Sequence, residues 1–228
     1  MQTYDAHVEE LRKRLVYTVG FLLLGTFVMF YFSQDILGFL QADLDVSLHA
    51  LTAYETFYTQ LMIAVLLGFL FTLPFTLYQA LKFMEPGLKE EEYNMLRNYL
   101  PLSIILFGIG SIFSYEFIVK YSLSFFQTTA SAADVTSVWG LKNTLGFAMK
   151  ISAFTGVLFQ LPIASVILAR AGLIDREVMI KYRVYFLVGV LLLAAMATPP
   201  DIITQAIVTL PVIGLYQLSI FLVEKVTD

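Results

Sequence analysis

FYTQLMIAVLLGFLFTLPFTLYQAL, the stretch from Phe57 to Leu81, contains no charged residue in its 25 positions. As an α-helix it is roughly 38 Å long, at 1.5 Å per residue. A helix needs about 20 predominantly apolar residues to cross the hydrocarbon core of a bilayer. This stretch therefore predicts a membrane-spanning helix in an integral membrane protein.

Five further apolar runs predict an all-α protein with six transmembrane helices. They cover residues 15–33, 98–119, 144–169, 184–197 and 202–223. The run 184–197 has only 14 residues, and Thr198-Pro199-Pro200-Asp201 ends its helix because consecutive prolines cannot continue one. Pro211 interrupts the last run. We expect one membrane domain over residues 1–228 with short fifth and sixth helices, as a crossing pair or a re-entrant pair.

Basic residues lie mainly in alternate gaps between these runs. Eleven of the 14 are in such gaps: Arg12, Lys13, Arg14, Lys82, Lys89, Arg97, Arg170, Arg176, Lys181, Arg183 and Lys225. Residues 15–81 and 184–224 contain none. Cytoplasmic loops of membrane proteins are enriched in Lys and Arg. The pattern therefore predicts that both termini are cytoplasmic.

Composition supports the membrane assignment and excludes several kinds of site. The chain is 58% hydrophobic and 14% charged, with a mean hydropathy of +0.77, far from the profile of a soluble domain. It has no cysteine and only two separated histidines, so we expect neither disulfides nor a metal or other cofactor. No small-x-small cleavage site follows the first run, which predicts a retained anchor. The chain has no basic patch interleaved with aromatic residues, so nothing in the sequence supports nucleic-acid binding.

Proline and polar residues inside the runs predict local irregularities. Pro74 and Pro162 predict kinks, either ordinary ones or kinks that build a concave bundle wall. Gln160 is about 15 Å deep and needs a polar partner, either in a neighbouring helix or in the transmembrane helix of a partner protein. Lys150 lies near the outer end of its run, where its side chain reaches the interface.

Four blocks of sequence resemble the TatC family, the signal-recognition subunit of the twin-arginine protein translocase. His7–Leu15 is similar to H-x-x-E-L-R-x-R-L, Pro74–Leu88 to P-x-x-x-Y-Q-x-x-x-F-x-x-P-x-L followed by a glutamate at Glu92, Phe159–Pro162 to F-E-x-P, and Thr198–Gln205 to T-P-P-D-x-x-x-Q. The blocks follow the family's order over essentially the whole chain. Two departures are Gln160, where the family commonly has glutamate, and Leu40–Leu44, which lacks a common proline.

The resemblance implies a non-enzymatic receptor in the cytoplasmic (inner) membrane. It implies binding of the twin-arginine signal peptides of folded precursors, recruitment of TatA/TatB-type single-span subunits, and a homo-oligomer in the receptor complex. The signal-binding residues implied are Glu10, Arg12, Phe83 and Glu92. Gln160 and Pro162 are implied for partner contact, and Pro74, Pro86, Pro199, Pro200, Asp201 and Gln205 for helix and loop structure.

The chemistry of the implied site agrees with the residue types present. A guanidinium group is best recognised by carboxylates that accept bidentate, charge-assisted hydrogen bonds. Glu92 and Glu10 are the candidate carboxylates, and Phe83 offers an apolar or cation–π face. The alternative for Glu10 is an i,i+4 pair with Arg14.

Other membrane functions have less support in the sequence. The alternative is a small-solute transporter, but such proteins place paired ionisable groups near the midplane, and Lys150 is the only deep charge. An intramembrane enzyme needs a nucleophile with a base, paired aspartates or a zinc motif, and none appears.

Overall fold

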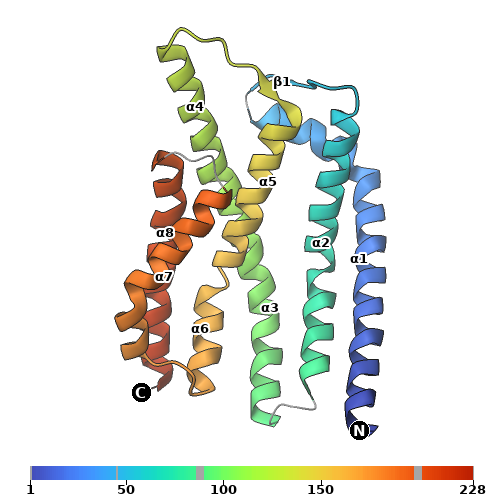
Figure 1. Ribbon diagram of the computed structural model, residues 1–228, viewed down its shortest axis with the longest axis vertical. Coiled ribbons are helices and arrows are strands. Elements are labelled where there is room, and N and C mark those ends of the chain that lie inside the picture. Colours follow the sequence, from blue (N-terminus) through green and yellow to red (C-terminus); the bar gives the residue numbers. More distant parts are fainter. Residues whose placement is uncertain (1, 45, 86–89, 198–201, 228) are drawn as a thin grey trace. The chain divides into compact units, whose positions relative to one another are not determined.

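The computed structural model describes residues 2–44, 46–85, 90–197 and 202–227. Its elements in chain order are α1 (Gln2–Asp43), β1 (Leu48–His49), α2 (Glu55–Met84), α3 (Glu90–Phe113), the π-helix η2 (Ser114–Val119), α4 (Lys120–Ala132), β2 (Trp139–Gly140), α5 (Leu141–Leu158), α6 (Leu161–Arg170), α7 (Arg176–Ala197) and α8 (Ile202–Thr227) (Figure 1). The protein is almost entirely helical, as predicted.

Within the described ranges, six helical segments are long and apolar enough to cross a membrane. They are Glu9–Asp43, Glu55–Phe83, Tyr93–Ala132, Leu141–Arg170, Arg176–Ala195 and Ile203–Val226. This confirms the six predicted spans. The fifth and sixth, with 20 and 24 residues, are the shortest, as expected. Each helix extends beyond its apolar run because polar residues continue the helix at its ends; α7, for example, begins at Arg176.

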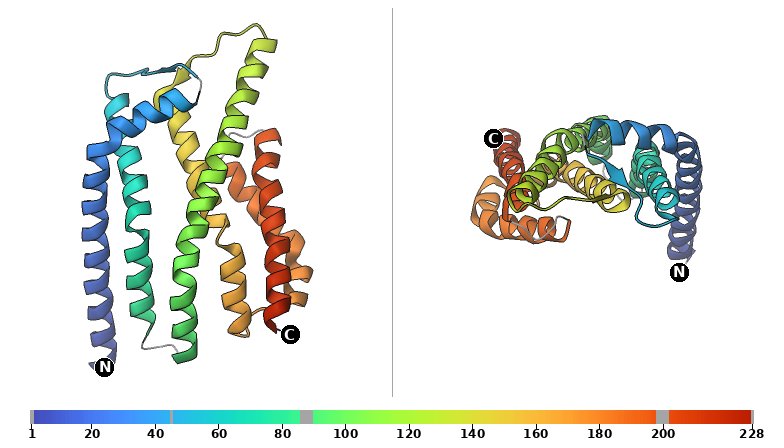
Figure 2. Two further views of the ribbon diagram at one scale, coloured as in Figure 1. Left: turned by 180° about the vertical axis from the view of Figure 1, so that it is seen from behind. Right: turned by 90° about the horizontal axis from the view of Figure 1, so that it is seen from above.

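The chain forms two compact units. The first contains Met1–Ile104 and Trp139–Thr144, and its main feature is the antiparallel pair α1 and α2 (Figure 2). Small residues bring these two helices close together. A Cβ atom on Gly68 of α2 would lie 2.7 Å from the Thr26 backbone of α1, and one on Gly25 would lie 2.5 Å from the Thr72 side chain. Only glycine therefore fits at the crossing.

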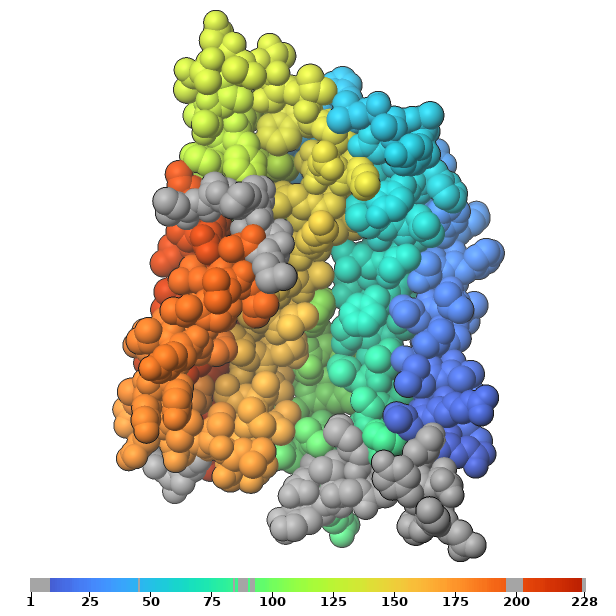
Figure 3. All heavy atoms as spheres, viewed as in Figure 1, coloured from blue at the N-terminus to red at the C-terminus, as the bar shows by residue number. Residues whose placement is uncertain are grey.

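The outer side of α1 is apolar and exposed. Its side chains stand at the surface beside those of α2 (Figure 3). Phe27 and Tyr31 are 77% and 81% exposed. Large exposed aromatic residues along a helix of this length are expected where the helix faces lipid rather than water.

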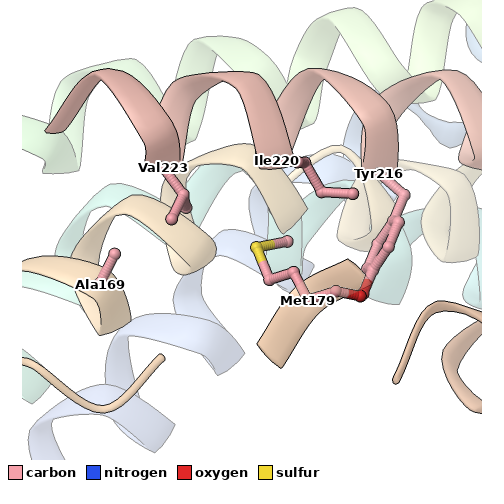
Figure 4. Close-up of a cluster of buried hydrophobic side chains, with 5 residues drawn as sticks. All are labelled: Ala169, Met179, Tyr216, Ile220 and Val223. Atoms are coloured by element: carbon pink, nitrogen blue, oxygen red, sulfur yellow. The ribbon is translucent and has the colours of Figure 1, made fainter. Parts of the chain in front are cut away.

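The second unit contains Ile105–Val138 and Leu145–Asp228, and its core lies between α6, α7 and α8. Ala169, Met179, Tyr216, Ile220 and Val223 are buried together (Figure 4). The Tyr216 hydroxyl donates a hydrogen bond to the Met179 backbone carbonyl at 2.8 Å, and the Phe186 ring stacks on Tyr216 with centroids 4.4 Å apart. Aromatic stacking and a satisfied hydroxyl together fix the angle between α7 and α8.

Proline has different consequences in different spans. α2 continues through Pro74, whose side chain is exposed. The fourth span is broken into α5 and α6 at Phe159 and Gln160, and Pro162 lies in the first turn of α6, where a missing N–H is tolerated. The irregularity predicted at Pro162 is thus a break between two helices.

Candidate functional site

The predicted signal-binding residues gather at one end of the first unit. Figures 1 and 2 show the N-terminal part of α1, the end of α2 and the start of α3 at this end. Glu10 lies in α1, Phe83 is half-buried at the end of α2, and Glu92 lies in the first turn of α3. The side chain of Glu92, and the whole of Pro86, lie outside the described part of the chain.

Glu10 holds a guanidinium group of its own helix. Arg14 donates from Nε to Glu10 Oε1 at 3.1 Å and from Nη2 to the same oxygen at 2.5 Å. The i,i+4 pair that the sequence offered as the alternative for Glu10 is therefore present. Arg14 also donates from Nη1 to Gln79 Oε1 at 3.2 Å, so the pair is tied to α2. The side chains of Arg14 and Glu10 are 23% and 37% exposed.

A second i,i+4 pair on the same helix behaves differently. Lys13 Nζ lies 3.1 Å from Glu9 Oε1, and both side chains are about two-thirds exposed, at 65% and 67%. Arg12 is exposed as well. Neighbouring positions of α1 thus present one pair toward α2 and another toward solvent, so Glu10 and Glu9 differ in surroundings although not in charge.

The end of α2 is joined to α3 by a lysine. Lys82 Nζ forms an ion pair with Glu85 Oε2 at 2.8 Å and lies over the Tyr93 ring, 5.7 Å from its centroid. The cation–π contact brings the first turns of α3 to the last turn of α2. Glu85 is therefore engaged by Lys82 of its own helix end.

The predicted partner-contact residues lie in the second unit. Gln160 is half-buried at the break between α5 and α6, and its Nε2 donates to the Gly156 carbonyl at 3.4 Å. Pro162 is buried in the first turn of α6. The adjacent Phe159 packs on α3, where a Cβ atom on Gly110 would lie 2.6 Å from its ring. The structure does not place Gln160 within the unit that holds Glu10.

Of the residues predicted to shape the loop between the last two spans, one is described. Gln205 Nε2 donates to the Leu191 carbonyl at 2.9 Å and so ties α8 to α7. Pro199, Pro200 and Asp201 lie outside the described residues. Gln205 therefore acts in the packing of this helix pair.

Sequence reasoning missed Glu55, which connects two distant segments. Glu55 is only 4% exposed. It accepts backbone N–H groups of Leu51 at 2.7 Å, Thr52 at 3.2 Å and Lys142 at 2.8 Å. Next to it, β1 and β2 pair in parallel, with Leu48 opposite Trp139. The available signal was an acidic residue in the first turn of a long helix, where carboxylates cap free N–H groups.

Comparison with known proteins agrees with this architecture. Residues 6–211 match the family described as Sec-independent protein translocase protein (TatC). The chain is 33% identical over 94% of its length to Sec-independent protein translocase protein TatC of Listeria innocua, covering 88% of that protein. It is 30% identical to the corresponding protein of Aquifex aeolicus, over 97% of this chain and 94% of that one.

A solved structure shows the same fold. The crystal structure described as Twin Arginine Translocase Receptor TatC superposes with a TM-score of 0.85 at 30% identity, covering 97% of this chain and 100% of that one. Members of this family are components of a protein translocase, and the family is not enzymatic. The predicted membrane protein of six spans, the family model and the shared fold together show that this chain belongs to the TatC family of Sec-independent protein translocase components.

Proposed function

We propose that this chain is the receptor of its translocase and binds the twin-arginine signal peptides of folded precursor proteins. The observation that supports this most directly is the Glu10–Arg14 pair. Its geometry shows that the Glu10 carboxylate accepts two N–H groups from one guanidinium. A signal arginine presents the same group, and charge-assisted hydrogen bonds of this kind are among the strongest available at a protein surface.

The second arginine of the signal is assigned to Glu92. Glu92 lies in the first turn of α3, at the same end of the first unit as Glu10. Phe83, between them in sequence and half-buried, supplies an apolar face beside the guanidinium groups. Arg12 belongs to the exposed surface next to this site.

The site is proposed to face the cytoplasm of a cell whose inner membrane holds the protein. The charge asymmetry supports this orientation, because the basic gaps include the segments that carry Glu10 and Glu92. Both termini are then cytoplasmic. Precursor proteins made in the cytoplasm reach the carboxylates without first crossing the membrane.

Recruitment of TatA/TatB-type single-span subunits is assigned to Gln160 and Pro162. The break between α5 and α6 leaves a half-buried amide in the middle of an apolar span. An amide at this depth gains from a polar residue in a neighbouring transmembrane helix. The complete receptor is proposed to contain several copies of this chain together with these subunits.

Binding of a fluorescent signal peptide to the purified protein in nanodiscs tests the receptor proposal. The peptide with two arginines should bind more tightly than the same peptide with two lysines. Glu10→Gln and Glu92→Gln should each weaken binding at least tenfold, whereas Glu9→Gln and Glu90→Gln, which remove the same charge nearby, should change it less than twofold. Equal binding of both peptides to the unaltered protein would refute the proposal.

A further inference from the structure

The carboxylate assigned to the signal is already engaged by a guanidinium of the protein itself. Glu10 Oε1 accepts both Nε and Nη2 of Arg14, at 3.1 and 2.5 Å. A signal arginine that approaches this carboxylate competes for the same oxygen. Binding of the signal at Glu10 is therefore an exchange of one guanidinium for another, and its free energy depends on how well the displaced side chain is accommodated.

Arg14 has a second acceptor that does not depend on Glu10. Its Nη1 donates to Gln79 Oε1 of α2 at 3.2 Å, so one guanidinium bridges two helices. The planar group offers five N–H donors in a fixed arrangement, which permits both contacts at once. When Glu10 is occupied by a signal arginine, Arg14 retains the Gln79 amide oxygen as its partner.

The register of α1 and α2 keeps Gln79 in place. Gly25 and Gly68, at the close crossing of the two helices, each lie 11 residues from the members of the Arg14–Gln79 pair. Eleven residues are close to three turns of an α-helix. Arg14 therefore projects from the same side of α1 as Gly25, and Gln79 from the same side of α2 as Gly68. The glycine contact thus holds the Gln79 amide opposite Arg14.

We propose that Arg14 is an internal occupant of the signal site and that Gln79 is the residue that receives it on displacement. This inference rests on the proposed receptor function. Only a ligand that matches the two N–H bonds of Arg14 replaces it efficiently. A lysine ammonium is a point charge without the planar pair of donors, so it competes poorly. Displacing Arg14 costs the same free energy for either ligand, so Arg14 and Gln79 set the affinity of the site, and the preference for arginine comes from the Glu10 carboxylate itself.

Arg14→Gln tests the competition directly. Without the internal guanidinium, the twin-arginine peptide should bind roughly three- to tenfold more tightly, because one partly exposed ion pair no longer has to be broken. The twin-lysine peptide should gain by a similar factor, so the ratio of the two affinities should stay unchanged. Lys13→Gln is the matched control, because it removes one positive charge from the exposed Glu9–Lys13 pair one position earlier. It should change affinity less than twofold.

Gln79→Leu tests the second half of the proposal and leaves the Glu10–Arg14 pair intact. Displaced Arg14 then has no acceptor on α2, so twin-arginine binding should weaken roughly three- to tenfold. In the Arg14→Gln background the same substitution should have no effect. This double-mutant cycle separates displacement from a structural role, because a purely structural defect would appear in both backgrounds.

The outcomes distinguish the inference from the function on which it rests. If the unaltered protein does not prefer the twin-arginine peptide, the receptor proposal fails. If it does, but Arg14→Gln weakens binding or Gln79→Leu acts equally in both backgrounds, the receptor proposal stands and the displacement is overturned. Thermal unfolding of each variant accompanies the measurement. Where Arg14→Gln does not fold, Arg14→Lys replaces it in both steps, because it keeps the charge but loses the planar pair of donors, and it should tighten binding in the same direction.

Discussion

The Glu55 carboxylate accepts the backbone N–H of Lys142 at 2.8 Å, although 87 positions separate the two residues in the sequence. The same carboxylate accepts the N–H groups of Leu51 and Thr52. Lys142 contributes a second contact, with its Nζ 4.5 Å from the centroid of the Tyr58 ring. One buried acidic side chain thus joins the segment before α2 to the start of α5.

Glu55→Ala should loosen this connection. The three backbone N–H groups lose the buried carboxylate that accepts them, and hydrogen bonds to charged groups contribute more than those between neutral groups. We expect a thermal midpoint several degrees lower and faster trypsin cleavage after Lys142. Glu55→Gln retains an acceptor oxygen and should have a smaller effect. Glu116→Gln, which alters an exposed pair with Lys120, is the control. Unchanged cleavage in Glu55→Ala would show that the strand pairing alone holds these segments.

Gly110→Ala should destabilise the contact between α3 and Phe159. The new Cβ atom would lie 2.6 Å from the Phe159 ring and 2.8 Å from its Cβ atom, so the whole side chain must move. Overpacking of this kind costs roughly 1–3 kcal/mol. The measurement is unfolding in detergent. Gly108→Ala, two positions earlier on the same helix, should be neutral or slightly stabilising, because no described atom lies within 4 Å of its Cβ position.

Gly68→Ala should separate α1 from α2. Its Cβ atom would lie 2.7 Å from the backbone of Thr26, which cannot rotate away as a side chain can. We expect lower stability by about 1–3 kcal/mol or more. A cysteine pair placed across the two helices should also crosslink less efficiently. Gly20→Ala on α1, whose Cβ position has no described atom within 4 Å, should leave both readouts unchanged. Equal effects of the two variants would contradict the close crossing.

Gln160→Leu should weaken contact with a single-span partner subunit. Leucine removes both the donor and the acceptor of the amide at the break between α5 and α6. We expect less photocrosslinking to the partner from a probe placed beside position 160. Gln160→Glu should retain the contact, because a carboxyl group also forms hydrogen bonds. An unchanged photocrosslinking yield in Gln160→Leu would exclude this amide from the partner interface.

The six spans, and the Glu10–Arg14 pair as an alternative for Glu10, followed from the sequence alone. Crossing a bilayer requires about 20 apolar residues, and the sequence of each segment by itself shows whether it has them. The pairing of Glu10 with Arg14 is equally local, since positions i and i+4 are neighbours on any α-helix. The resemblance to the family could be recognised for a related reason. Its motifs are short stretches of sequence, and they occur in a fixed order along the chain.

The partners of Glu55, Gly110 and Arg14 on other helices depended on the tertiary structure. Gln79 is 65 positions from Arg14, and no periodicity in either helix specifies which residue of α2 lies opposite. The close approach of α1 and α2 at Gly25 and Gly68 decides which residue of α2 lies opposite Arg14, because larger side chains at the crossing would hold the helices apart. The sequence therefore determined which segments enter the membrane and which carboxylates are candidates. Packing between helices decided where the guanidinium of Arg14 has its second acceptor, at Gln79 of α2.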